Sequence, residues 1–163
     1  MGRRASWTGT SCPIARGADV LGEPWTLVIL RDAHLGTTRF DEFRSHLGIA
    51  DNVLAARLAR MVETGLLTRV PYRDGGGRTR EEYRLTEAGA DTLPVIHALG
   101  RWGDAHTNSP TAAEPMQLIH TTCGQLTRPG ERCDHCGADL TRADLNRLEL
   151  GTHQEVPLAA PVD

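Results

Sequence analysis

The segment of residues 38–83 constrains the fold of this 163-residue chain more than any other part of the sequence. Phenylalanine and leucine recur at helical spacing behind Thr38, which is placed to cap a helix, with Asp41 three residues later completing a weak capping box. Gly48 and Ile49 then predict a tight turn before a second helix. Two helices joined by so short a turn are typical of a helix-turn-helix.

The second predicted helix ends at Gly65, a residue type that favours helix C-termini. Two strands rich in β-branched and aromatic residues are predicted next, over residues 66–73 and 79–85, joined by an Asp-Gly-Gly-Gly turn. Helix, turn, helix and hairpin is the order of elements in a winged helix-turn-helix, which is a DNA-binding fold. The apolar face of the second helix consists of Leu54, Leu58 and Met61.

The face of the second helix opposite Leu54 is suited to a DNA major groove. Small side chains there let the helix backbone approach the groove floor, and asparagine and arginine pair bidentately with adenine and guanine. The hairpin tip adds Arg78 and Arg80 beside three glycines, a flexible positive finger suited to phosphates or a minor groove. Steps of about 100° per residue place Asn52, Ala56, Ala59 and Arg60 on the outer face, and Arg57 on its flank as a phosphate contact or a packing residue.

Residues 12–102 resemble the HxlR-type winged-helix regulators, which are relatives of the MarR group. The matching stretches are CPIARGADVLGEPWTLVILRDAHLGTTRFDEFRSHLGIADNVLAARLARMVETGLL, EYRLTEAG and LPVIHALGRW, in the family's order. The resemblance implies an α+β winged-helix and dimerisation domain over residues 12–105, in a homodimeric transcriptional regulator that binds palindromic double-stranded DNA. We add Thr38 and Arg39 to the predicted DNA-binding set. Ala50 departs from the family's usual capping serine, so Asp51 must cap or start the recognition helix.

Helices on both sides of the helix-turn-helix are expected to supply core and dimer contacts. One is predicted over residues 12–21, with proline at its first position, and another begins at Glu23-Pro24. A third is predicted from Thr86 to Trp102, although Pro94 inside it removes a hydrogen bond. Because the resembling family places proline similarly, we expect one kinked dimerisation helix rather than two helices.

Cys12 is a candidate redox sensor. The dipole of the helix that starts beside it favours a thiolate, and Arg16 one turn later adds positive charge. Some members of the resembling family sense oxidants or electrophiles through a cysteine at this place, which makes an oxidant or a small molecule a possible effector. The alternative is a half-buried, unreactive thiol.

Charge and composition narrow the function further. The net charge of −3 argues against a nonspecific nucleic-acid binder, but residues 57–84 carry seven arginines and four acidic residues, so the predicted DNA face is locally basic. No apolar run approaches the roughly 20 residues that cross a bilayer. Residues 1–11, expected to be disordered, lack the hydrophobic segment of a signal peptide, so we expect a cytoplasmic protein.

Two short motifs near the C-terminus predict a metal site. His120-x2-Cys123 and Cys133-x2-Cys136 lie nine residues apart, and each ends next to a glycine that permits a tight turn. Three thiolates and one imidazole form a ligand set that tetrahedral Zn²⁺ accepts as a structural ion. Alternatives remain: His135, His153 or a water as the fourth ligand, a redox pair Cys133–Cys136, or a ribbon without metal.

These motifs define a predicted zinc-ribbon-like β module over residues 116–150, which follows a linker over residues 106–115. Strands are predicted at residues 116–122 and 126–128, and a short helix over residues 138–150. The Pro-containing residues 151–163 are expected to form a flexible tail.

No enzyme motif competes with these predictions. The sequence offers no nucleophile–base pair or acidic pair, and Gly75-Gly76-Gly77 lacks the Lys-Ser/Thr ending of a phosphate-binding loop. The remaining alternative to a DNA-binding regulator is a protein–protein adaptor, or a redox- or effector-responsive module, that uses the winged-helix surface and the zinc ribbon.

Overall fold

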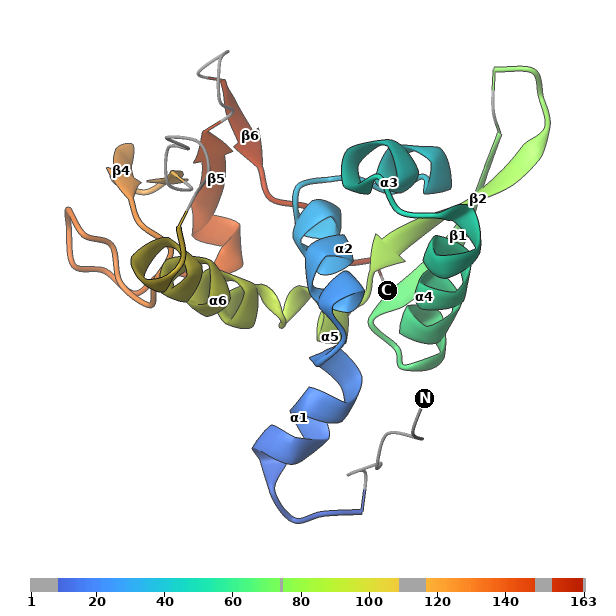
Figure 1. Ribbon diagram of the computed structural model, residues 1–163. Coiled ribbons are helices and arrows are strands. Elements are labelled where there is room, and N and C mark those ends of the chain that lie inside the picture. The colour runs from blue at the N-terminus through green and yellow to red at the C-terminus, as the bar shows by residue number, and fades with distance from the viewer. Residues whose placement is uncertain (1–8, 74, 109–116, 149–153, 163) are drawn as a thin grey trace.

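The computed structural model has the α+β class that the sequence predicts: a helical body, a hairpin wing and a small β module (Figure 1). It describes residues 9–73, 75–108, 117–148 and 154–162. The elements in chain order are α1 (Pro13–Leu21), α2 (Pro24–His34), α3 (Phe40–Leu47), α4 (Asp51–Glu63), β1 (Leu67–Arg73), β2 (Thr79–Leu85), α5 (Glu87–Ala90), α6 (Leu93–His106), β3 (Leu118–His120), β4 (Gln125–Thr127), η1 (Arg142–Asp144), β5 (Leu145–Leu148) and β6 (Glu155–Pro157).

The core of the winged-helix domain surrounds α2. Ile29 and Leu30 of α2 and Phe43 of α3 are fully buried, and α3 and α4 both pack against α2. The apolar face predicted for α4 is confirmed, because Leu54, Leu58 and Met61 are all buried in this core. Burial of such side chains stabilises a fold by about 1.5–3 kcal/mol each, so this cluster holds the helix-turn-helix in place.

The start of α3 differs from its prediction. The N-cap residue is Arg39 rather than Thr38, and Glu42 rather than Asp41 accepts the backbone N–H of Arg39 at 3.0 Å. The reason is that the hydroxyl of Thr38 donates instead to the carboxylate of Glu82, which is buried in β2 and needs polar partners. Thr38 therefore links the helix-turn-helix to the hairpin.

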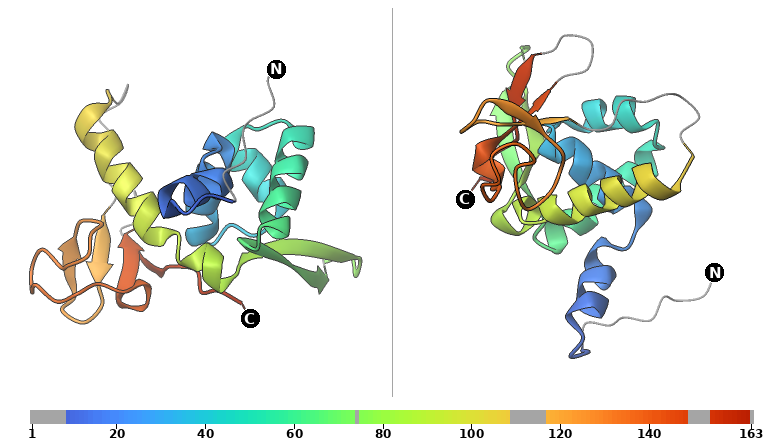
Figure 2. Two further views of the ribbon diagram at one scale, coloured as in Figure 1. Left: turned by 90° about the horizontal axis from the view of Figure 1, so that it is seen from below. Right: turned by 90° about the vertical axis from the view of Figure 1, so that its left-hand side faces the viewer.

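The hairpin is antiparallel, with register Leu67↔Leu85 through Arg73↔Thr79, which confirms the two predicted strands within one residue. Its base is attached to the body by the Tyr83 N–H, which donates to the Thr38 carbonyl at 2.7 Å. The distal half of the hairpin projects past α4 and forms the wing (Figures 1 and 2).

The prediction of a single kinked helix after the wing is wrong. Thr86 does cap a helix, since its hydroxyl oxygen accepts the Gly89 N–H at 3.1 Å, but that helix is only α5. The chain turns at Asp91 and Thr92 before α6 begins. Pro94 falls in the first turn of α6, where a missing N–H costs no intrahelical hydrogen bond, so two helices avoid the defect that one would contain.

The C-terminal module is a four-stranded antiparallel sheet of order β4-β3-β5-β6. The predicted short helix over residues 138–150 is wrong: the 3₁₀ turn η1 and β5 occupy residues 142–148, because β3 offers β5 a strand edge to pair with. β3 is shorter than its predicted range, and β4 is shifted by one residue from its predicted range. Within the described residues, no helix of the chain is long and apolar enough to cross a membrane.

The flexible tail expected over residues 151–163 is wrong for residues 154–162. They form β6 and then hydrogen-bond to the body, through the N–H of Ala159 to the carbonyl of His34 and that of Val162 to the carbonyl of Leu85. The remaining tail residues, most of the predicted linker, and residues 1–8 of the predicted disordered N-terminus lie outside the described residues.

Two histidines are buried beside the module. His34 at the end of α2 is 2% exposed and His97 in α6 is 6% exposed. Burial is the main reason that the pKa of each is lowered to about 4; His97 and Arg142 lower that of His34 further, and Arg101 that of His97. His34 Nε2 also lies 3.1 Å from the Thr92 hydroxyl. Because both rings are buried and both pKa values are lowered, both histidines are neutral packing residues at pH 7.

We expect the protein to lose stability as the pH falls from about 6.5 towards 4. In this window an unfolded histidine, with a pKa of about 6.5, binds a proton that the folded residue excludes. The loss is at most about 3 kcal/mol per histidine. Chemical denaturation at about pH 7.5 and at about pH 5 measures this difference in the free energy of unfolding. His97→Gln should make the free energy of unfolding depend less on pH. The control His106→Gln, at an exposed position, should leave this dependence unchanged. An equal free energy of unfolding at both pH values would contradict the expectation.

Candidate nucleic-acid interface and metal centre

The outer face of α4 is available to a ligand. Asn52, Ala56 and Arg60 are exposed, whereas Ala59 is half-buried. The Arg60 side chain is 61% exposed and pairs only loosely with Glu63, at 3.4 Å one turn later. An exposed pair of this kind contributes little, so a base or a phosphate can displace it.

The N-terminus of α4 has no side-chain cap. Its N-cap is Ala50, and Asp51 is the first helical residue, as the departure from a capping serine implies. Arg44 of α3 lies 3.5 Å from the Asp51 carboxylate and 3.3 Å from that of Asp41. The only local sequence signal for Arg44 is its spacing from Asp41. Its cationic side chain offsets both acidic groups.

Arg57 does not lie on the open face. Its side chain is 25% exposed, and its guanidinium pairs with Glu23, just before α2, at 3.5 Å. It therefore ties α4 to the start of α2. This contact favours the packing alternative for Arg57 over the phosphate contact.

The wing and the start of α3 form a second surface, on which arginines alternate with acidic residues. Arg39 stacks over the ring of Tyr72 at 4.7 Å from its centroid, and Arg80 lies 3.9 Å from Asp41. These residues line a groove of about 620 Å³, and Arg78 is exposed at the wing tip. Arg39, Arg78 and Arg80 thus share the wing side of the domain, while Arg60 belongs to α4.

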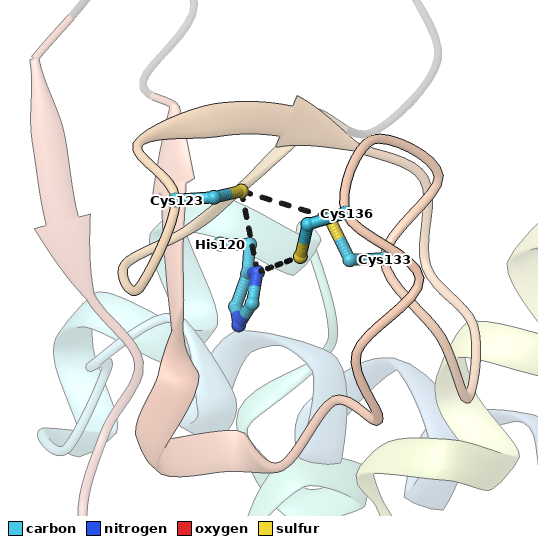
Figure 3. Close-up of side chains that lie close together, drawn as sticks. All are labelled: His120, Cys123, Cys133 and Cys136. Atoms are coloured by element: carbon cyan, nitrogen blue, oxygen red, sulfur yellow. Dashed lines mark hydrogen bonds between the residues drawn. The ribbon is translucent and has the colours of Figure 1, made fainter.

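Four side chains of the C-terminal module converge as the sequence motifs predict (Figure 3). The Cys123 and Cys136 sulfurs each lie 3.4 Å from His120 Nδ1, and the Cys123 and Cys133 sulfurs are 3.8 Å apart. All four ligand atoms lie within 4.8 Å of one another. Corners of a tetrahedron around Zn²⁺, with bonds of about 2.0 Å to nitrogen and about 2.3 Å to sulfur, are about 3.5–3.8 Å apart. The residues present therefore fit this ion.

Two matching turns create this convergence. The Gly124 N–H donates to the His120 carbonyl at 2.8 Å, and the Gly137 N–H donates to the Cys133 carbonyl at 2.9 Å. Both glycines have positive φ angles, +66° and +73°, which residues with a Cβ atom rarely adopt. Each turn presents its two ligands to the same point, so the spacing in the sequence translates directly into a shared site.

The environment of the cluster acts differently on two of its thiols: burial raises the pKa of the Cys123 thiol, whereas that of Cys133 is lowered. Backbone N–H groups of Cys136 and His135 help to lower the pKa of the Cys133 thiol to about 6, towards the thiolate that a metal requires. His135 is exposed and is not part of the cluster, and His153 lies outside the described residues. Among the described candidates for the fourth ligand, His120 is therefore the one in position.

Cys12 is the N-cap residue of α1, at the start of the predicted helix, and it is exposed rather than half-buried. The Arg16 guanidinium donates to the carbonyls of Thr10 and Ser11, at 2.9 and 2.8 Å, and so folds back over this turn. The thiol is open to solvent with a cation nearby.

Comparison with known proteins agrees with this geometry. A family model described as HxlR-like helix-turn-helix matches residues 20–111. The uncharacterised HTH-type transcriptional regulator Rv3095 of Mycobacterium tuberculosis is 43% identical over 128 residues, covering 78% of this chain and 79% of its own. The candidate transcription factor PA1607, whose crystal structure is known, is 37% identical in sequence to this chain. The two structures superpose with a TM-score of 0.68 over 86% of this chain and 96% of PA1607.

A redox regulator, HypR, in its oxidised form is also similar, at 27% identity and a TM-score of 0.54, over 60% of this chain and all of its own. The fold and the relatives are those of transcriptional regulators, which are not enzymes. They do not favour the adaptor alternative.

Proposed function

Because the chain belongs to the HxlR-like helix-turn-helix family, we propose that this transcriptional regulator reads an inverted-repeat DNA operator as a homodimer. The observation that carries the proposal is the pair of adjoining surfaces, the open outer face of α4 and the arginine-bearing wing. An α4 helix entering the major groove reads bases, while the wing neutralises the neighbouring backbone.

The dimer is supported by apolar surface that the DNA-binding face does not use. α1 buries none of its residues, and Ile14 on it is 81% exposed. On α6, Val95, Leu99 and Trp102 are 46%, 46% and 58% exposed and recur along one side. Apolar stripes of this kind on a soluble protein mark an interface. A two-fold dimer through α1 and α6 would present two α4 helices to successive major grooves, about 34 Å apart.

A gel-shift assay with the DNA upstream of the protein's own gene, together with light scattering at micromolar concentration, tests this proposal. A dimer that shifts this DNA at a single inverted repeat is the expected result. A monomer with unimpaired binding would overturn the two-fold arrangement, and failure to shift any DNA would overturn the operator.

Arginines of the two surfaces should respond differently to truncation. Arg60→Ala is expected to weaken specific binding by about 1–3 kcal/mol and to alter the preference at one base pair. Arg78→Ala and Arg80→Ala should weaken binding to all sequences and flatten its salt dependence, because they lose phosphate contacts. Fluorescence anisotropy at several salt concentrations measures both effects, with Arg128→Ala as a control, because the Arg128 side chain is 81% exposed in the module. If all three variants bind like the wild type, the DNA-binding face is assigned incorrectly.

We assign structural zinc to His120, Cys123, Cys133 and Cys136. The assignment rests on the close approach of the four ligand atoms and on the thiol-rich donor set. Four protein ligands fill a tetrahedral site and leave no open position for a reacting water, so a structural role fits better than a catalytic one. When bound, the ion would hold the two turns of the module together.

A second proposal concerns Cys12 as an oxidant sensor, supported by its exposure and by the likeness to the redox regulator HypR. A mild oxidant or a quinone should reduce operator binding by the wild-type protein, whereas Cys12→Ser should not respond. An equal response of the serine variant would assign the effect to the thiols of the module.

A further inference from the structure

We propose that metal binding at the C-terminal module controls DNA binding, through a strap of residues 154–162 that ties the module to the winged-helix domain. The proposal rests on the proposed function of both sites. It adds a physical connection between them, which runs through hydrogen bonds of the described residues. In Figure 1 the strap runs from β6 back past α2 to the C-terminus beside the base of the wing.

The connection begins at a metal ligand. His120 is the last residue of β3 and pairs with Leu145 of β5. β5 in turn pairs with β6, from Leu148↔Glu155 to Asn146↔Pro157. The strap therefore starts as the outer strand of the same sheet that positions the imidazole. A disturbance of β3 passes to the strap through two strand pairings.

Arg142 provides a second connection in parallel. It belongs to the 3₁₀ turn η1, and its guanidinium donates to the Ala159 carbonyl at 2.6 Å. At the other end of η1, the Asp144 carbonyl accepts the N–H of Thr121, the residue after the ligand His120, at 2.8 Å. One short turn thus contacts the strap on one side and the ligand-bearing loop on the other.

The strap ends at the base of the DNA-binding surfaces. The Ala159 N–H donates to the His34 carbonyl at 3.0 Å, and the Val162 N–H donates to the Leu85 carbonyl at 2.9 Å. Residues 159–162 line a cavity of about 380 Å³ together with Thr37 and Thr38, just before α3, and residues 83–85 of β2. The strap therefore borders the junction at which the wing is attached to the helix-turn-helix.

The order of the strap depends on the order of the module, and the module has a small core. Among the described residues of the module, the buried apolar side chains are Leu118, Ile119, Cys133 and Leu145. So few side chains do not hold a separate β module together without a staple, which the metal supplies. Loss of the metal should loosen β3, β5 and β6 and so release the strap. The wing would then be less ordered in the free protein, and DNA binding would have to supply the free energy that orders it, which lowers the affinity.

The test compares zinc-loaded protein with protein treated with a zinc chelator, using full-length chain and the upstream DNA. Chelation should lower DNA affinity about tenfold, within the usual range of coupling between two sites. It should also raise the hydrogen-exchange rates of the Ala159 and Val162 amides, and re-addition of Zn²⁺ should reverse both changes.

Arg142→Ala is the critical variant. It removes the strap contact but no metal ligand, so zinc should still bind at one ion per chain while the effect of zinc on DNA affinity shrinks. Arg132→Ala is the matched control, because Arg132 pairs with Asp139 inside the module, at 3.1 Å, and should leave the zinc response intact.

The outcomes separate this inference from the proposed function. Equal DNA affinity with and without zinc would overturn the inference and leave the DNA-binding function standing. If neither form binds the DNA, the proposed operator fails, and the exchange rates decide the inference alone: unchanged exchange at Ala159 and Val162 on chelation would overturn it. A wild-type zinc response in Arg142→Ala would overturn the role given to η1.

Discussion

Gly89→Ala is expected to destabilise the protein by about 3 kcal/mol or more, although it adds only one methyl group. A Cβ at Gly89 in α5 would overlap the carbonyl oxygen of Leu66 and would lie 3.1 Å from Cδ2 of Leu85. The Leu66 carbonyl is part of the backbone and accepts the N–H of Thr86 at 3.2 Å, so it cannot turn aside as a side chain would. The alanine variant must separate α5 from the start of β1.

The matched control is Gly100→Ala. Gly100 lies in α6, and apart from its two chain neighbours and the backbone of its own helix no described atom lies within 4 Å of the position of an added Cβ, so alanine should be neutral or should stabilise the helix by up to about 1 kcal/mol. Chemical denaturation of both variants measures the difference. A Gly89→Ala variant as stable as the wild type would contradict the close packing of α5 against the segment that links α4 to β1.

Nothing in the local sequence marks Gly89 as such a position, because the contact joins residues 66 and 89. By contrast, the helix-turn-helix could be predicted because its evidence is local. Leu54, Leu58 and Met61 follow the helical period, and the glycine turn separates two strands with clear β composition. Both patterns describe an element by its immediate neighbours in the chain, and the structure confirms both.

Several of the predictions that were wrong depend on contacts between residues far apart in the sequence. β5 forms because β3 supplies an edge more than 20 residues earlier, and a helical reading of residues 138–150 could not anticipate that pairing. The strap is ordered by the carbonyls of His34 and Leu85, which are far away in sequence. Thr38 does not cap α3 as predicted, because its hydroxyl donates instead to Glu82 on β2, which is also far away in sequence.

The candidate site divides in the same way. The four cysteine and histidine ligands could be found from spacing, since each pair is set by its own tight turn. The helical period placed Arg57 on the flank of α4, but it could not decide between a phosphate contact and the ion pair with Glu23 from another helix. The spacing of Asp41 and Arg44 on one helix is visible in the sequence, but the second acidic neighbour of Arg44, Asp51, is brought to it only by the fold.

Removal of the metal is expected to disorder the C-terminal module while the winged-helix domain stays folded. Purified, untagged protein should contain about one zinc per chain. The apolar residues of the module are few, and metal binding is linked to folding in domains of this size, so Cys133→Ser should lose zinc and protection of the module together. The core around α2 has its own apolar cluster and should keep its protection. Elemental analysis and hydrogen exchange measure the two effects.

The comparison of His120→Ala with His135→Ala tests the fourth ligand. His120 is 2% exposed with Nδ1 facing two sulfurs, so its loss should lower zinc affinity by more than the roughly 10–100-fold that loss of an outer hydrogen-bond partner causes. His135 lies between two ligands in sequence but is exposed, and its alanine variant should bind zinc like the wild type. Full zinc occupancy in His120→Ala would assign the fourth position elsewhere. Metal-free wild-type protein with a protected module would show that the sheet and its small core suffice without the ion.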